Sequence, residues 1–280
     1  MYSNDFSEYS DEVFRIELNR NIDYLTRGKQ KHLHPRAFLL GGQPGSGKTT
    51  LHTIVEKQLN NDVIIIDNDK FKLQHPNFKK ILELYGANYV DYVTPFSNRM
   101  TESIIQSLIS QKYNLVIEGT LRTTDVPIKT ANLLLNNNYD IFLLVMGVSK
   151  ELSYLSTLAR YEHAYKINPE AARRTSKEAH DVVVQNIANN LDYLHKQKLF
   201  KSIQLYDREE NILYSSLNNC LLPGYFLSKE LHRPVSRATL EREYANLKKL
   251  SETNGHFNEN YTAILQQINE LNVCKNRTRE

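Results

Sequence analysis

The segment GGQPGSGKTT, residues 41–50, restricts the possible folds of this chain more than any other feature. From Gly42 to Thr49 it matches the pattern G-x-x-x-x-G-K-[ST] in full. The apolar run 37–40 precedes it, and residues 51–59 follow with apolar side chains at helical spacing. A glycine loop between a strand and a helix is the context in which this pattern indicates a phosphate-binding loop. The sequence therefore predicts a nucleotide site at the end of a strand.

Each residue type in this loop has a chemical reason to be there. Glycines let the backbone N–H groups wrap a phosphate, and the following helix presents its positive N-terminus. Lys48 is suited to reach the β- and γ-phosphates, and the Thr49 hydroxyl is suited to bind Mg²⁺. The alternative is a degenerate loop kept only for folding. The candidate nucleotide contacts are Gly42, Gln43, Pro44, Gly45, Ser46, Gly47, Lys48, Thr49 and Thr50.

Apolar runs and helical patterns alternate through the middle of the chain. The run 63–66 is continuous and β-branched, as in a strand buried on both faces of a parallel sheet. Further strands are predicted at 114–120, 141–148 and 203–206, with a hairpin partner at 212–214. The order strand, helix, strand predicts an α/β fold with a doubly wound, mainly parallel sheet and flanking helices.

Helical spacing predicts the remaining elements and three regions. The predicted helices cover 10–28, 51–59, 97–111, 130–136, 150–167 and 175–199. Beyond residue 218 the chain is helical and polar, with Pro223-Gly224 as a break. We therefore divide the chain into an N-terminal helix and basic link (1–36), the core (37–217) and a helical C-terminal extension (218–280).

Composition excludes several classes of protein. The 35 Lys and Arg against 32 Asp and Glu give a net charge of +3, spread too evenly to indicate a nucleic-acid surface. The two cysteines, Cys220 and Cys274, are too few for a disulfide framework or a zinc site and suit a reducing cytosol. No signal peptide or membrane-length apolar stretch is evident. We expect a cytoplasmic protein with neither nucleic acid nor membrane as partner.

Two acids, Asp67 and Asp69, directly follow the second predicted strand. The carboxyl ends of the strands are where open α/β sheets bind ligands, so at least one carboxylate is expected to face the phosphates. It could help to hold Mg²⁺, or act as general base for an acceptor hydroxyl. The structural alternative is helix capping, because Asp and Asn favour the N-cap position. The pattern alone leaves these roles open.

Further polar residues are expected at the same edge of the sheet. Glu118, Thr120 and Arg122 follow the third strand, where a charge directly after a buried run is costly unless it is paired or faces a ligand. Arg160 and the pair Arg173-Arg174 are candidate γ-phosphate contacts, since phosphoryl transfer needs cations where negative charge accumulates. The alternative for each arginine is a solvated surface charge.

Several motifs, taken in order, resemble the zeta toxins, the toxic halves of bacterial epsilon/zeta toxin–antitoxin systems. The similarity extends over about residues 38–216 and is carried by GGQPGSGKTT, VIIIDNDKFKLQHPNF, VTPFSNRMTE, NLVIEGT, RTTDVPI, HDVVVQN and REENILYSS. The resemblance implies a P-loop kinase-like fold. It also implies transfer of the γ-phosphate of ATP or GTP to the 3′-hydroxyl of the amino sugar in UDP-N-acetylglucosamine, which stalls peptidoglycan synthesis.

The resemblance also implies roles for individual residues. It assigns the phosphate-loop lysine to Lys48, the Mg²⁺-binding hydroxyl to Thr49 and the catalytic base to Asp69. The arginines at the triphosphate fall on Arg160 and Arg173, and the acceptor contacts fall on Asp69, Glu102, Glu118, Thr120 and Arg122. Leu121 stands where a small residue such as glycine is expected in close relatives.

The partner implied by the resemblance is a small helical epsilon-type antitoxin that blocks the nucleotide site, in a complex of two toxins and two antitoxins. Two rival interpretations stay open. One is a P-loop kinase with another acceptor, such as a different nucleotide sugar, an antibiotic or a nucleic-acid 5′ end. The other is a nucleotide-dependent binding module with little catalysis. A motor or GTPase switch is the least favoured, because the acids and arginines surround a second-substrate pocket.

Overall fold

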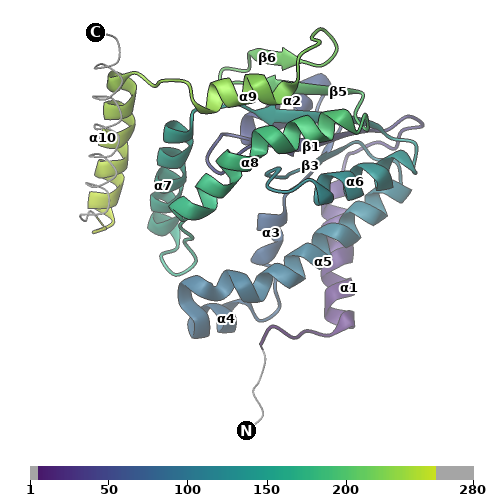
Figure 1. Ribbon diagram of the computed structural model, residues 1–280. Coiled ribbons are helices and arrows are strands. Elements are labelled where there is room, and N and C mark those ends of the chain that lie inside the picture. Colours follow the sequence, from purple (N-terminus) through teal and green to yellow (C-terminus); the bar gives the residue numbers. More distant parts are fainter. Residues whose placement is uncertain (1–5, 257–280) are drawn as a thin grey trace.

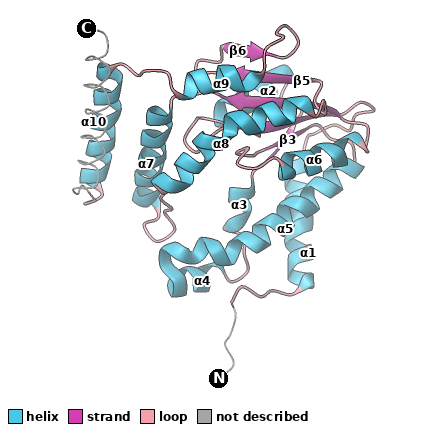
Figure 2. Cartoon of the chain, viewed as in Figure 1, coloured by secondary structure: helices cyan, strands magenta, loops and turns pink. Residues whose placement is uncertain are grey.

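The central element of the fold is a twisted sheet, seen edge-on in Figures 1 and 2. The computed structural model describes residues 6–256, so Cys274 and the end of the predicted C-terminal extension lie outside the described residues. Within 6–256 the sheet has six strands in the order β2-β3-β1-β4-β5-β6. Their bounds are β1 Arg36–Gly41, β2 Ile64–Ile66, β3 Leu115–Ile117, β4 Asp140–Met146, β5 Ser202–Tyr206 and β6 Ile212–Ser215.

The topology confirms the predicted mainly parallel α/β fold. Strands β1 to β5 pair in parallel, and β6 pairs antiparallel with β5 as the predicted hairpin. The chain leaves β1 on one side for β2 and β3, and returns on the other side for β4. The crevice outside the carboxyl end of β1 is therefore the topological switch point, where doubly wound sheets bind their ligands.

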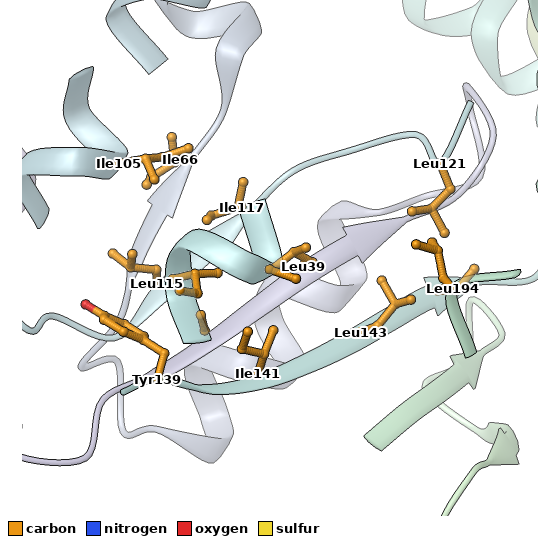
Figure 3. Packing of buried hydrophobic residues seen from close by; sticks show 14 of the residues in the cluster. Leu39, Ile66, Ile105, Leu115, Ile117, Leu121, Tyr139, Ile141, Leu143 and Leu194 are labelled. Carbon is orange, nitrogen blue, oxygen red and sulfur yellow. The ribbon is translucent and has the colours of Figure 1, made fainter. Parts of the chain in front are cut away.

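Helices cover both faces of the sheet because β1 alternates its side chains between two cores. Phe38 and Leu40 pack with Leu51 and Val55 of α2 on one face. On the other face Leu39 joins a larger cluster with residues of α1, α5, α6, α8 and α9. Figure 3 shows this second cluster, where Leu39, Leu115, Ile117, Ile141 and Leu143 lie together.

Each of the six predicted helices corresponds to a helix of the structure, and α7 has the predicted bounds, whereas α3 and α4 were not predicted. The bounds of the helices are α1 Asp11–Thr26, α2 Thr49–Gln58, α3 Asn68–Lys72, α4 Phe78–Tyr85, α5 Tyr89–Ser110, α6 Asp125–Leu135, α7 Lys150–Ile167, α8 Lys177–Lys196, α9 Pro223–Leu231 and α10 Arg237–Thr253, with a 3₁₀ turn at Gly86–Asn88. No helix within the described residues is long and apolar enough to cross a membrane.

Three predictions about helices were wrong, and proline explains each. Helix α5 begins eight residues before the predicted Ser97 and contains Pro95, while α6 begins at Asp125, before Pro127. Pro223-Gly224 does not break the chain but forms the first turn of α9, where proline lacks only an N–H that would be unpaired anyway. A Cβ on Gly224 would lie 2.5 Å from the carbonyl oxygen of Ala188, so glycine allows α9 to approach α8 closely.

Two further groups of helices complete the molecule. Helix α4 and the first turns of α5 lie beyond α3, away from the sheet (Figure 1), and share an apolar cluster that includes Ile81, Tyr89 and Val93. Helix α10 packs on α7 through Leu240 and Leu247. The division into regions 1–36, 37–217 and 218–280 stays a prediction, although Leu227 and Leu231 of α9 belong to the main core.

Candidate active site

The phosphate loop connects β1 to α2 at the switch point of the sheet. Gly42, Gly45 and Gly47 have φ angles of +147°, +73° and +95°, which L side chains rarely adopt. A Cβ on Gly45 would lie 2.0 Å from the carbonyl oxygen of Ser153, so the close approach to α7 also requires glycine. The loop backbone therefore leads directly into the N-terminus of α2, where backbone N–H groups without helical partners are suited to bind an anion.

The other loop residues complete this cradle. Lys48 is half-buried, and its Nζ donates to the carbonyl oxygen of Gly42 at 3.1 Å. Thr49 is exposed as the first residue of α2, where its hydroxyl is a hard oxygen donor of the kind that Mg²⁺ prefers. Gln43 is buried and donates to the carbonyl oxygen of Val148 at 2.7 Å, which anchors the loop to the end of β4. Pro44 and Thr50 are half-buried, and Ser46 is buried.

Several of the predicted site residues carry charges that act on the ammonium group of Lys48. Burial lowers the pKa of Lys48, and the nearby cation of Arg160 acts in the same direction. The carboxylates of Glu118, Asp69 and Asp67 act on the same ammonium and raise its pKa. Residues from four separate parts of the sequence therefore share one electrostatic environment around the phosphate loop.

The two acids after β2 have different positions. Asp67 is the N-cap of α3, and its Oδ1 accepts from the backbone N–H of Asp69 at 3.0 Å. Asp69 is exposed, and its Oδ1 lies 2.6 Å from Nζ of Lys72. Capping thus uses Asp67 and leaves the carboxylate of Asp69 to the site.

These surroundings shift the two carboxyl groups in opposite directions. Burial raises the pKa of Asp67, and the nearby charge of Glu118 raises it further. Desolvation also raises the pKa of Asp69, but the hydrogen bond from Lys72 and the cations Lys72, Arg173 and Arg160 outweigh it, so the net shift is downward. Asp69 is therefore ionised at neutral pH and able to accept a proton.

The two candidate arginines come from α7 and from the segment that follows it. Arg160 on α7 is exposed, and its Nη2 donates to Oγ1 of Thr175 at 3.4 Å. Arg173 lies between α7 and α8, and its charge acts on Asp69. The charge of the neighbouring Arg174 acts on Tyr161.

A cavity of about 260 Å³ opens at the carboxyl end of β3. Lys48, Asp69, Arg160 and Arg173 are not among its lining residues, and Glu118, whose charge acts on Lys48, connects it to them. Glu118, Thr120 and Arg122, three of the predicted acceptor contacts, line it together with apolar residues. Glu102 is not among the lining residues; it is exposed on α5, with Oε1 3.7 Å from Nζ of Lys129. The cavity therefore offers both polar contacts and an apolar wall to a second substrate.

Leu121 is buried in the wall of this cavity with a φ of +54°. Its Cδ1 occupies space that only glycine leaves free at position 41, since a Cβ there would lie 2.4 Å away. Nδ2 of Asn190 on α8 donates to the carbonyl oxygens of Leu121 and Arg122, at 2.9 and 3.0 Å. Position 121 thus holds a leucine although its positive φ suits glycine. Gly41 leaves room for the Leu121 side chain, and Asn190 of α8 holds the Leu121 backbone.

Three site residues were missed by sequence reasoning. Nε2 of His52 lies 2.9 Å from Oε1 of Glu118, although without hydrogen-bond geometry. Lys72 holds Asp69, as described above. Arg208, just after β5, donates to the carbonyl oxygens of Gly45 at 2.6 Å and Ser46 at 3.2 Å. A basic residue at the carboxyl end of β5 was the signal that could have identified Arg208.

The phosphate loop, the ionised carboxylate, the cations and the adjoining cavity define a P-loop phosphotransferase of the kinase type. Comparison with known proteins identifies the family: the Zeta toxin family model matches residues 22–219. The chain belongs to the zeta toxin family, the toxins of toxin–antitoxin systems with a kinase-type fold. Both the predicted resemblance and the predicted fold are thereby confirmed.

Individual relatives match over nearly the whole chain. Toxin zeta of Streptococcus pyogenes is 47% identical over 265 residues, which cover 94% of this chain and 92% of that protein. Toxin PezT of Streptococcus pneumoniae is 42% identical over 248 residues, 89% of this chain and 98% of that protein. A solved structure from the PezAT chromosomal toxin–antitoxin system of S. pneumoniae has a TM-score of 0.82 and 40% identity, covering 88% of this chain and 99% of the other.

Proposed function

We propose that this protein transfers the γ-phosphate of ATP or GTP to the 3′-hydroxyl of the amino sugar of UDP-N-acetylglucosamine. The observation that carries the proposal is the position of Asp69. The carboxylate of Asp69 does not cap α3, and neighbouring cations keep it ionised. Like Glu118, which lines the adjoining cavity, it acts electrostatically on Lys48. Membership of the zeta toxin family supports the choice of acceptor.

In the proposed reaction Lys48, Arg160 and Arg173 neutralise the charge that develops on the γ-phosphate. The sugar oxygen forms a bond to the γ-phosphorus while the bond to the bridging β–γ oxygen breaks, and the nucleoside diphosphate leaves with that electron pair. Asp69 accepts the proton of the attacking hydroxyl. Mg²⁺, held by Thr49 and the phosphate oxygens, would supply further charge neutralisation when bound.

The acceptor is proposed to bind in the cavity beside β3. Glu118, Thr120 and Arg122 would contact the sugar and its phosphates, and Glu102 is a fourth proposed contact from α5. The reacting metabolites are cytoplasmic, so the proposal implies action in the cytoplasm. Loss of UDP-N-acetylglucosamine to the phosphorylated product would block peptidoglycan synthesis.

The direct test mixes purified protein, Mg²⁺, ATP or GTP, and UDP-N-acetylglucosamine, and measures by mass spectrometry whether the sugar nucleotide gains one phosphate. Lys48→Ala and Asp69→Asn should abolish the product. Lys57→Ala is the matched control, because Lys57 is an exposed lysine on α2, the helix that begins directly after Lys48, and it is paired with Glu210. A wild-type protein that binds ATP but makes no product would favour another acceptor or a binding module.

The proposed protein partner is an epsilon-type antitoxin, in a complex of two toxins and two antitoxins. The structural relative from the PezAT toxin–antitoxin system supports an antitoxin partner. Co-expression followed by light scattering would give the mass of the complex. Bound antitoxin should prevent ATP binding, and a complex that still binds ATP normally would contradict the proposed blocking of the nucleotide site.

A further inference from the structure

The segment 168–176, between α7 and α8, carries Arg173 and is anchored at both ends. At its start Asn168 ends α7, and its carbonyl oxygen accepts from the backbone N–H of Ala172 at 3.1 Å. At its end Thr175 accepts the hydrogen bond from Arg160. In the middle of the segment, directly before Arg173, the backbone N–H of Ala171 donates to Oδ1 of Asn168 at 3.3 Å, which closes a local turn at the end of α7.

Tyr89, the first residue of α5, supplies a second contact to this part of the segment. Its hydroxyl donates to the carbonyl oxygen of Ala171 at 3.1 Å, and only 5% of the residue is exposed. Its ring packs edge-on against Phe78 of α4, with the ring centroids 5.5 Å apart. The phenol therefore has one packed orientation, and that orientation points its hydroxyl at the arginine segment.

Tyr89 is also close enough to both groups proposed to act on the reacting phosphate to be affected by their charges. Burial raises the pKa of Tyr89, and the charges of both Arg173 and Asp69 reach the phenol. The hydroxyl thus stays protonated and remains a hydrogen-bond donor across the physiological pH range.

The candidate base is connected to the same group of helices. Asp69 lies in the first turn of α3, which packs along α5. Nδ2 of Asn68 donates to Oγ1 of Thr101 on α5 at 2.9 Å. Helix α5 is therefore connected to the base through α3 and to the arginine segment through Tyr89.

We propose that Tyr89 is a positioning residue that sets the placement of Arg173 relative to Asp69, and so aligns the γ-phosphate contact with the base. The inference rests on the proposed roles of Arg173 and Asp69. Tyr89 acts through the carbonyl oxygen of Ala171 and does not itself touch substrate. Its loss should affect the γ-phosphate and leave the rest of the nucleotide unaffected.

The variant Tyr89→Phe removes only the hydroxyl oxygen and keeps the packed ring. Tyr139→Phe is the matched control, because the buried hydroxyl of Tyr139 also donates to a backbone carbonyl oxygen, that of Tyr113, at 2.8 Å. Tyr139 precedes β4, at the opposite edge of the sheet from the site. The Tyr139 hydroxyl also lies 3.4 Å from the carbonyl oxygen of Leu108, so the control loses at least as much hydrogen bonding as Tyr89→Phe and shows the effect of a general loss of stability.

Titration calorimetry with ATP and with ADP gives the deciding measurement, because only ATP carries the γ-phosphate. Tyr89→Phe should weaken ATP binding by roughly five- to tenfold and ADP binding by less than about twofold, as expected for one misplaced charged contact. Tyr139→Phe should change neither affinity. Equal ATP affinities in Tyr89→Phe and wild type would overturn the inference.

A double-mutant cycle tests whether Tyr89 acts through Arg173. In an Arg173→Ala background, Tyr89→Phe should cause no further loss of ATP affinity, whereas an undiminished loss would overturn the inference. These measurements need no acceptor. If UDP-N-acetylglucosamine is not the substrate, wild-type phosphate transfer fails while the ATP titrations still decide the role of Tyr89.

Discussion

Arg208 provides the sharpest test of how the phosphate loop is held. Its guanidinium makes three hydrogen bonds, to the carbonyl oxygens of Gly45 and Ser46 and to Oγ of Ser156 at 3.0 Å. Arg208 thereby occupies carbonyl groups of the loop and leaves the loop N–H groups for phosphate. Arg208→Met keeps most of the aliphatic stem and removes all three hydrogen bonds.

The size of the effect follows from these contacts. A hydrogen bond to a charged group contributes about 1.5–3 kcal/mol, but Arg208 is half-buried, and water can replace part of what the carbonyl groups lose. Burial of the guanidinium lowers the pKa of Arg208, and the variant avoids the energetic cost of desolvating this charge. We expect a net loss of about 2–3 kcal/mol and a melting temperature lower by roughly 5–10 °C.

The assay combines thermal unfolding with ATP titration at a temperature where the variant is folded. Arg208→Met should weaken ATP binding about tenfold beyond its effect on stability, because the loop is no longer fixed. Arg208→Lys should recover part of the loss, since an ammonium reaches fewer of the three acceptors. Arg237→Met, at an exposed arginine on α10, is the control and should change neither quantity. An unchanged melting temperature and ATP affinity in Arg208→Met would refute this account of the loop.

Three further predictions concern the acceptor side of the site. Gly41→Ala should destabilise the fold by a clash with Leu121, and adding Leu121→Gly should restore the melting temperature in thermal unfolding. If the two substitutions lower stability additively, the contact between these residues is contradicted. Lys72→Met should raise the pKa of Asp69, because it removes a hydrogen bond and a cation that lower this pKa. The acid limb of the pH profile of kcat/KM should therefore move to higher pH, and an unchanged limb would contradict the action of Lys72 on the proposed base. Asn190→Ala releases two carbonyl groups of the loop after β3, so steady-state kinetics should give a several-fold higher KM for the acceptor and an unchanged KM for ATP.

The sequence predicted the sheet well because its strands are buried on both faces. Runs such as Ile64–Ile66 and Leu115–Ile117 are continuously apolar, and the phosphate loop fixes which strand comes first. The start of α5 was missed because Pro95 interrupts the pattern that indicates a helix. In the structure, the turns before Pro95 are stabilised by packing against α4, a tertiary contact that local sequence cannot reveal.

The sequence predicted which candidate site residues would lie at one edge of the sheet, but not the contacts that hold them in place. Lys48, Asp69 and Glu118 follow strands, so parallel topology alone brings them to one edge of the sheet. The hydrogen bond from Arg208 to Ser46 joins residues 162 positions apart, and no local pattern encodes it. The positive φ of Leu121 was equally hidden, because it depends on the space that Gly41 leaves open.

Helix α7 explains how these supports act together. Ser153 and Ser156 face the phosphate loop and Arg208, and Arg160, one turn further on, contacts the arginine segment. The spacing of three and four residues puts them on one face of the helix. On α7 the fully buried Glu162 accepts from Nδ2 of Asn254, just after α10, at 2.7 Å. Helix α10 therefore packs on the same helix that contacts the phosphate loop and carries Arg160.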